Sequence, residues 1–66
     1  MGHGKGGIMT KYQIGDIVTN NHYHYLIESI SDYSPVCYEM RCLEDNRIMY
    51  SYVIVVDNDI KIRMVA

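Results

Sequence analysis

The sequence has 66 residues, a net charge of −2 at pH 7 and 48% hydrophobic residues, which predicts one small globular domain and excludes a disordered chain. Its pI is about 5.8, which argues against a non-specific grip on nucleic-acid phosphates or on an anionic membrane surface, since both need clustered Lys and Arg. No apolar run approaches the length of a membrane span.

The N-terminal stretch differs from the rest in composition, because four of the five glycines lie there: Gly2, Gly4, Gly6 and Gly7. We expect residues 1–8 to form a disordered tail and residues 9–66 to form the folded domain. Lys5-Gly6-Gly7 can be encoded by a purine-rich ribosome-binding sequence. This leads to the hypothesis that translation starts at Met9 and that residues 1–8 are a translated leader or residues added to the protein.

The two cysteines and the N-terminal stretch bear on the cellular compartment of the protein. The N-terminal stretch lacks the apolar core of a signal peptide. Cys37 and Cys42 are separated by an odd number of positions, so in a regular strand they would point to opposite faces. We therefore expect two free thiols in a cytoplasmic protein.

From residue 11 onward, β-branched residues and tyrosines dominate, and no segment has the spacing of an amphipathic helix. We predict five strands, at residues 14–19, 23–31, 36–43, 47–53 and 60–65. Turn-forming residues separate them: Asn20-Asn21, Pro35 in the loop 31–35, Glu44-Asp45-Asn46, and Asp57-Asn58-Asp59.

Alternation within these strands predicts the core face. Tyr25 and Ile27 share a face but Ile30 breaks the parity, so we expect a bulge near Glu28-Ser29. The third and last predicted strands each have one uncharged face, which we expect to be buried: Val36, Tyr38, Met40 and Cys42 in the third, and Ile60, Ile62 and Met64 in the last.

Five short antiparallel strands in fewer than sixty residues are too few for a two-sheet sandwich, and an open sheet would leave long bare edges. Partial closure into a small barrel avoids both problems. Composition and pattern therefore predict an all-β, five-stranded antiparallel barrel.

Several segments resemble the small SH3-like barrels, including KOW- and Tudor-type modules. Tyr12-Gln13-Ile14-Gly15-Asp16-Ile17-Val18 resembles their Gly-Asp-x-Val entry. Tyr25-Leu26-Ile27 with Ile30, residues 38–43 and Asp45-Asn46 resemble the second and third strands and their hairpin. Residues 52–57 are similar to the short 3₁₀ turn before the last strand.

This resemblance covers residues 11–64 and implies an SH3-like barrel. The chain also resembles small proteins encoded by phages and Firmicutes. It departs from peptide-binding SH3 domains, which carry a groove Trp, because it has no Trp. It departs from KOW modules, which are usually basic.

Exposed aromatic and basic residues are the candidate partner-binding side chains. Most of the seven tyrosines are expected in the core or in half-buried strand positions. Tyr23 and Tyr33 flank loops and are the best candidates for an exposed aromatic patch. Arg41, Lys61 and Arg63 are expected on outward strand faces. They form either a modest basic patch or, as we favour, a solvated face that discourages edge-to-edge pairing.

His22 and His24 form a His-x-His pair, which on a strand would point both rings to one face and could ligate a metal. A structural zinc site needs two further ligands, and no Cys-x-x-Cys spacing supplies them. We favour two exposed histidines at a turn, and expect no metal and no cofactor.

The sequence has no catalytic constellation and no Gly-rich phosphate loop within the predicted domain, so we expect a non-enzymatic protein-binding module. The resemblance implies a phage or prophage protein that modulates or inhibits a bacterial host complex, of the anti-defence or host-takeover type. The alternative is a nucleic-acid-binding barrel that uses Tyr23, Tyr33, Arg41 and Lys61. We also expect a homodimer through edge strands, with outward Leu43 or Val65 in the interface.

Overall fold

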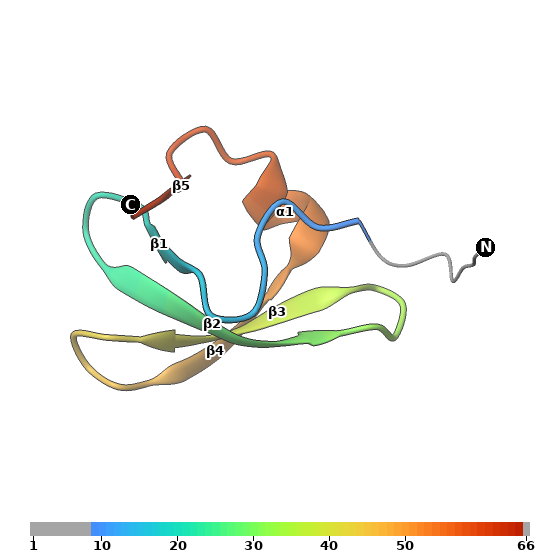
Figure 1. Ribbon diagram of the computed structural model, residues 1–66, viewed down its shortest axis with the longest axis horizontal. Coiled ribbons are helices and arrows are strands. Elements are labelled where there is room, and N and C mark those ends of the chain that lie inside the picture. Colours follow the sequence, from blue (N-terminus) through green and yellow to red (C-terminus); the bar gives the residue numbers. More distant parts are fainter. Residues whose placement is uncertain (1–8, 66) are drawn as a thin grey trace.

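The computed structural model describes residues 9–65, which form one five-stranded antiparallel sheet and one short helix (Figure 1). The predicted tail, residues 1–8, lies outside the described part. The elements follow the chain as β1 (Ile17–Thr19), β2 (His24–Ser31), β3 (Cys37–Cys42), β4 (Ile48–Tyr52), α1 (Val53–Asp57) and β5 (Arg63–Met64). The all-β prediction is confirmed, and each of the five strands lies within a predicted range.

The strand order is β4-β3-β2-β1-β5, so β1 pairs with both β2 and β5. The β2–β3 and β3–β4 hairpins form one twisted layer. Helix α1 lies over this layer, together with the segment that precedes β1 (Figure 1). β4 and β5 stand at the two ends of the strand order and do not pair with each other. Closure of this sheet into a barrel therefore stays a prediction. No helix within residues 9–65 is both long and apolar enough to cross a bilayer.

The predicted bulge in β2 is confirmed. Ile27 pairs with Met40 and Ser29 with Glu39, so Glu28 is left without a partner across the β2–β3 ladder. The extra residue places Ile27 and Ile30 on the same face, although three positions separate them. Both side chains then pack with the core.

The core lies between the inner face of the sheet, α1 and the segment before β1. Its buried members are Tyr12, Val18, Ile27, Tyr38, Met40, Val53 and Val56, and Tyr25, Ile30, Val36 and Ile62 pack against them in part. The predicted inward face of the third strand is confirmed, since Tyr38, Met40 and Cys42 are buried and Val36 is half-buried.

Two expectations near the C-terminal end are wrong. Val53 does not continue β4 but begins α1, in which Val53 and Val56 are buried one turn apart. Ile60 is 98% exposed and Met64 49% exposed, so of the three residues expected inward only Ile62 packs against the core. The reason is a turn: the Ile62 N–H donates to the Asp59 carbonyl at 3.1 Å, and β5 begins only at Arg63.

Three of the described residues adopt positive φ where the chain turns. Asn21 (φ 76°) lies between β1 and β2, and Asn46 (φ 64°) lies in the β3–β4 turn. Gly15 (φ 97°) bends the chain before β1, and its N–H donates to the Ile27 carbonyl at 2.8 Å. Gly and Asn tolerate this region better than other residues do, which explains why the chain turns at Asn21 and Asn46, both of which lie in predicted turns.

Candidate functional site

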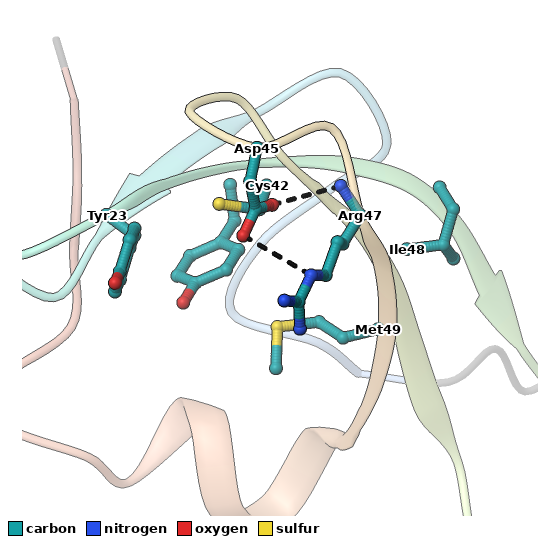
Figure 2. A pocket seen from close by; sticks show the side chains of 7 residues that line it. Tyr23, Cys42, Asp45, Arg47, Ile48 and Met49 are labelled. Atoms are coloured by element: carbon teal, nitrogen blue, oxygen red, sulfur yellow. Dashed lines mark hydrogen bonds and ion pairs between the residues drawn. The ribbon is translucent and has the colours of Figure 1, made fainter.

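A hollow of about 340 Å³ opens beside the β3–β4 turn (Figure 2). Its lining consists of Tyr23, Tyr25, Cys42, Asp45, Arg47, Ile48 and Met49. A second hollow of about 210 Å³ shares Tyr25 and Met49 with it and reaches Val55 and Val56 of α1. The second hollow is also lined by Val18 of β1 and Met40 of β3, two buried core residues.

The register of three strands places the floor of this hollow. Tyr25 of β2 is directly opposite Cys42 of β3, and the Cys42 N–H donates to the Arg47 carbonyl at 2.8 Å. Tyr25, Cys42 and Arg47 therefore form a row across the sheet. Met49 lies two residues beyond Arg47, so it shares that face. Figure 2 shows Arg47 and Met49 extending to the same side of β4 while Ile48 points away.

Two tyrosines form the aromatic wall. The ring centroids of Tyr23 and Tyr25 are 6.4 Å apart with the planes tilted by 54°, within the range in which aromatic pairs attract each other. Tyr23 is 46% exposed, whereas Tyr25 is partly buried. Burial, and next the nearby Cys42 thiol, raise the pKa of the Tyr25 phenol. Tyr25 is therefore a neutral hydroxyl at physiological pH, able to donate a hydrogen bond to a ligand.

An ion pair forms the rim. Arg47 Nε lies 3.6 Å from Asp45 Oδ2, and the Arg47 N–H donates to Asp45 Oδ1 at 3.0 Å. This backbone hydrogen bond is the main reason that the pKa of Asp45 is lowered. The Arg47 side chain is 82% exposed, so its guanidinium can also reach a partner. The hollow thus combines an apolar floor with one carboxylate and one guanidinium at its edge.

The two predicted binding tyrosines lie beyond opposite ends of β2. Tyr23 lines the hollow just before β2 begins, and Tyr33 follows the end of β2, where it is 80% exposed. β2 has eight residues and is therefore roughly 26 Å long. The structure does not bring Tyr23 and Tyr33 into one aromatic patch.

The predicted basic residues have separate surroundings. Arg41 binds Glu28 through Nε at 2.7 Å and Nη2 at 3.3 Å, and this pairing raises the pKa of Arg41. Arg63 on β5 donates to Asn21, and β2 and β1 lie between its strand and that of Arg41. Lys61 is exposed in the turn before β5. Because Glu28 neutralises the charge of Arg41, Arg41 is a poor phosphate ligand.

The histidine pair does not assemble a metal site with its neighbours. The His24 N–H donates to Glu44 Oε1 at 2.8 Å, and His24 Nδ1 lies 2.6 Å from Glu44 Oε2. These contacts, the backbone N–H first, lower the pKa of Glu44. His22 is exposed in the preceding turn. Within residues 9–65 no three His, Cys, Asp or Glu side chains are grouped to hold a metal ion.

Sequence reasoning missed Tyr25, Arg47 and Met49 as site residues, because Tyr25 and Met49 looked like ordinary strand positions. The predicted hairpin at residues 44–46 could have indicated Arg47, since a turn at these residues places Arg47 opposite Cys42. No protein-family model, curated protein or experimentally determined structure matches the chain at a significant level.

Proposed function

We propose that the protein is a non-enzymatic protein-binding module whose hollow receives an apolar side chain of a partner protein. The observation that carries this proposal is the lining of the hollow: two tyrosines and a methionine, with an arginine at the rim. Tyr, Met and Arg are the residues enriched where proteins bind each other, and a buried anchor in such a pocket dominates the binding energy.

The size of the hollow limits what it can contribute. A volume of about 340 Å³ is at the lower end of ligand pockets, enough for one aliphatic or aromatic side chain. Burying one such side chain contributes about 1.5–3 kcal/mol. The hollow therefore acts as an anchor point, and the partner must also touch the surrounding surface.

The charges favour a protein partner over nucleic acid. The rim holds a carboxylate beside its guanidinium, and Arg41 is neutralised by Glu28. A net charge of −2 provides no surplus for phosphate neutralisation. Base stacking on Tyr23 is the feature that the nucleic-acid alternative retains.

The SH3-like barrel and the biological setting belong to the same proposal. The strand order, with one helical turn between β4 and β5, supports the barrel resemblance of residues 11–64. The setting, a phage or prophage protein acting on a bacterial host complex, rests on the resemblance alone.

Capture from bacterial lysate tests the binding surface. The immobilised full chain should retain one protein in near-stoichiometric amount, with or without nuclease. Arg47→Glu should reduce capture by reversing the rim charge, and Met49→Lys should abolish it by placing a charge in the apolar floor. Quantitative mass spectrometry of the retained protein measures both effects.

Tyr33→Ala is the control, because it removes an exposed aromatic ring at the far end of β2, away from the hollow, and should leave capture unchanged. Capture that survives both hollow variants, or that depends on nuclease-sensitive material, would contradict the proposal. Circular dichroism of each variant establishes that the fold is retained.

A further inference from the structure

At one edge of the sheet, strand β4 has backbone N–H and carbonyl groups that point away from β3 at every second residue. The Arg47 carbonyl accepts from Cys42, and the Val53 N–H donates to Val36 at 2.9 Å. In an antiparallel ladder alternate residues point their backbone groups toward the same neighbour. Arg47, Met49, Ser51 and Val53 therefore point theirs toward β3, and the intervening residues of β4 point theirs away from it.

The outward-pointing residues are Ile48, Tyr50 and Tyr52, and no element in residues 9–65 pairs with that side of β4. Tyr52 is the N-cap of α1, so its carbonyl already accepts a helical hydrogen bond. Its N–H, and both backbone groups of Ile48 and Tyr50, face away from β3 without a strand partner.

The same residues leave their side chains uncovered on the outer face of the sheet. Ile48 is 38% exposed, Tyr50 68% and Tyr52 53%. β4 contains no charged residue and no proline, which are the usual devices that prevent edge pairing. The opposite edge differs, because β5 has only two residues and one of them is Arg63.

We propose that β4 pairs with β4 of a second copy, antiparallel, about a twofold axis through Tyr50. Tyr50 then lies opposite Tyr50 of the second copy, and the two exchange both backbone hydrogen bonds. The Tyr52 N–H donates to the Ile48 carbonyl of the other copy at each end. The Ile48 N–H shares the second lone pair of the Tyr52 carbonyl.

The side-chain sequence of β4 favours a second copy as the occupant of this edge. Reversing Ile-Met-Tyr-Ser-Tyr about its middle residue pairs Tyr with Tyr and Ile with Tyr on the outer face. Aromatic and aromatic–β-branched pairs are the combinations that stabilise neighbouring strands. A shift by one residue would oppose outer-face residues to inner-face residues. A shift by two would leave one outer-face residue without a partner in β4, so the register through Tyr50 pairs the most outer-face residues.

The available area sets the strength of the dimer. Taking about 200 Å² for each large side chain, the exposed parts of the three side chains amount to roughly 300 Å² per copy. A standard interface buries about 800 Å² per partner. The dimer should therefore be weak, with a dissociation constant that is micromolar or larger. Ile48 is shared with the lining of the hollow, but Arg47 and Met49, which the capture experiment changes, lie on the other face of β4. The dimer can therefore be tested separately from the proposed function.

Sedimentation velocity of the full chain from about 1 µM to about 1 mM tests the proposal across the range in which such a constant lies. The wild type should shift from monomer to dimer, and Tyr50→Lys should weaken association at least about tenfold by placing a charge at the axis. Tyr33→Lys, the same change at an exposed loop tyrosine, should have no effect. A wild type that is monomeric throughout, or a dimer unaffected by Tyr50→Lys, overturns the proposal.

Oxidative cross-linking tests the register. Residues opposite each other in a hydrogen-bonded pair have Cα atoms about 5.5 Å apart, which suits a disulfide. Tyr50→Cys should therefore form an intermolecular disulfide between the two copies, identified by mass spectrometry of the linked peptide. Ile48→Cys should not, because its equivalents lie roughly 13 Å apart along the strands. Equal cross-linking of the two variants overturns the register.

Discussion

Asp57 joins two distant parts of the chain through its two carboxylate oxygens. Oδ1 accepts from the Tyr38 hydroxyl at 2.6 Å, and Oδ2 accepts from the Lys11 N–H at 2.9 Å. The Tyr38 hydroxyl in turn accepts from the buried Tyr12 N–H at 3.1 Å. One phenol thus links the segment before β1 to β3 and α1.

Replacing this phenol should weaken the fold. Tyr38→Phe leaves the buried Tyr12 N–H without an acceptor, which costs about 1–3 kcal/mol. In a domain of this size each kcal/mol lowers Tm by roughly 4–8 °C. Thermal unfolding followed by circular dichroism measures the change. Tyr50→Phe, which removes an exposed hydroxyl, should have little effect, and an equal loss in both variants would refute the assignment.

Tyr38 should also give stability an alkaline limit. Burial first, and then the hydrogen bond to Asp57, raise the pKa of Tyr38 from 10.0 to about 12. A folded pKa above the unfolded value favours folding fully below pH 10.0, and the contribution disappears as pH rises toward 12.

Urea unfolding at roughly pH 8 and pH 11.5 tests this limit, since these values bracket the unfolded pKa of a tyrosine. The wild type should be more stable than Tyr38→Phe at the lower pH, and the difference should shrink at the higher. A constant difference between the two proteins across this range would rule out the titration of Tyr38 as its source.

At the scale of elements, the β3–β4 turn fixes the register of the hollow. Asn46 adopts φ 64°, its N–H donates to the Cys42 carbonyl at 2.7 Å, and its side chain accepts from Arg41. The turn brings Arg47 back beside Cys42 on the inner face. A change in this turn would move Met49 as well as Arg47.

Asn46 separates backbone from side-chain contributions to this turn. Asn46→Ala should destabilise the protein by about 1–2 kcal/mol, because a left-handed conformation is unfavourable for a residue with a Cβ. Asn46→Gly should be close to neutral, because glycine adopts this conformation freely. Chemical unfolding of the pair provides the comparison. If both variants lose equal stability, the Arg41 hydrogen bond and not φ governs the turn.

For the whole molecule, local patterns in the sequence predicted most of the sheet. Alternation predicted the buried face of β3, and the parity break at Ile30 predicted the bulge in β2. Both depend on the two-residue period of a strand, which the sequence displays directly. Alternation failed over residues 60–64, because Ile60, Ile62 and Met64 keep the period of a strand while the backbone forms a turn.

The candidate site was less accessible to sequence reasoning because it depends on how the sheet curves. Tyr23 was predicted as a binding residue from its place beside a turn, and it does line the hollow. Tyr33, which was expected to share a patch with Tyr23, lies beyond the far end of β2, because Tyr23 precedes this strand and Tyr33 follows it. Tyr25 and Met49 join Tyr23 only because the β3–β4 hairpin brings three strands into one row.

The position of Tyr12 has a consequence for how the chain folds as it is made. Its ring packs 6.1 Å from that of Tyr38, and its hydroxyl donates to the Ile62 carbonyl, 50 positions along the chain. Hairpins between neighbouring strands can form as soon as both strands emerge, whereas contacts of such long range come late. Tyr12 is synthesised before every described strand, yet its hydrogen bond to Ile62 can form only after residue 62 has left the ribosome.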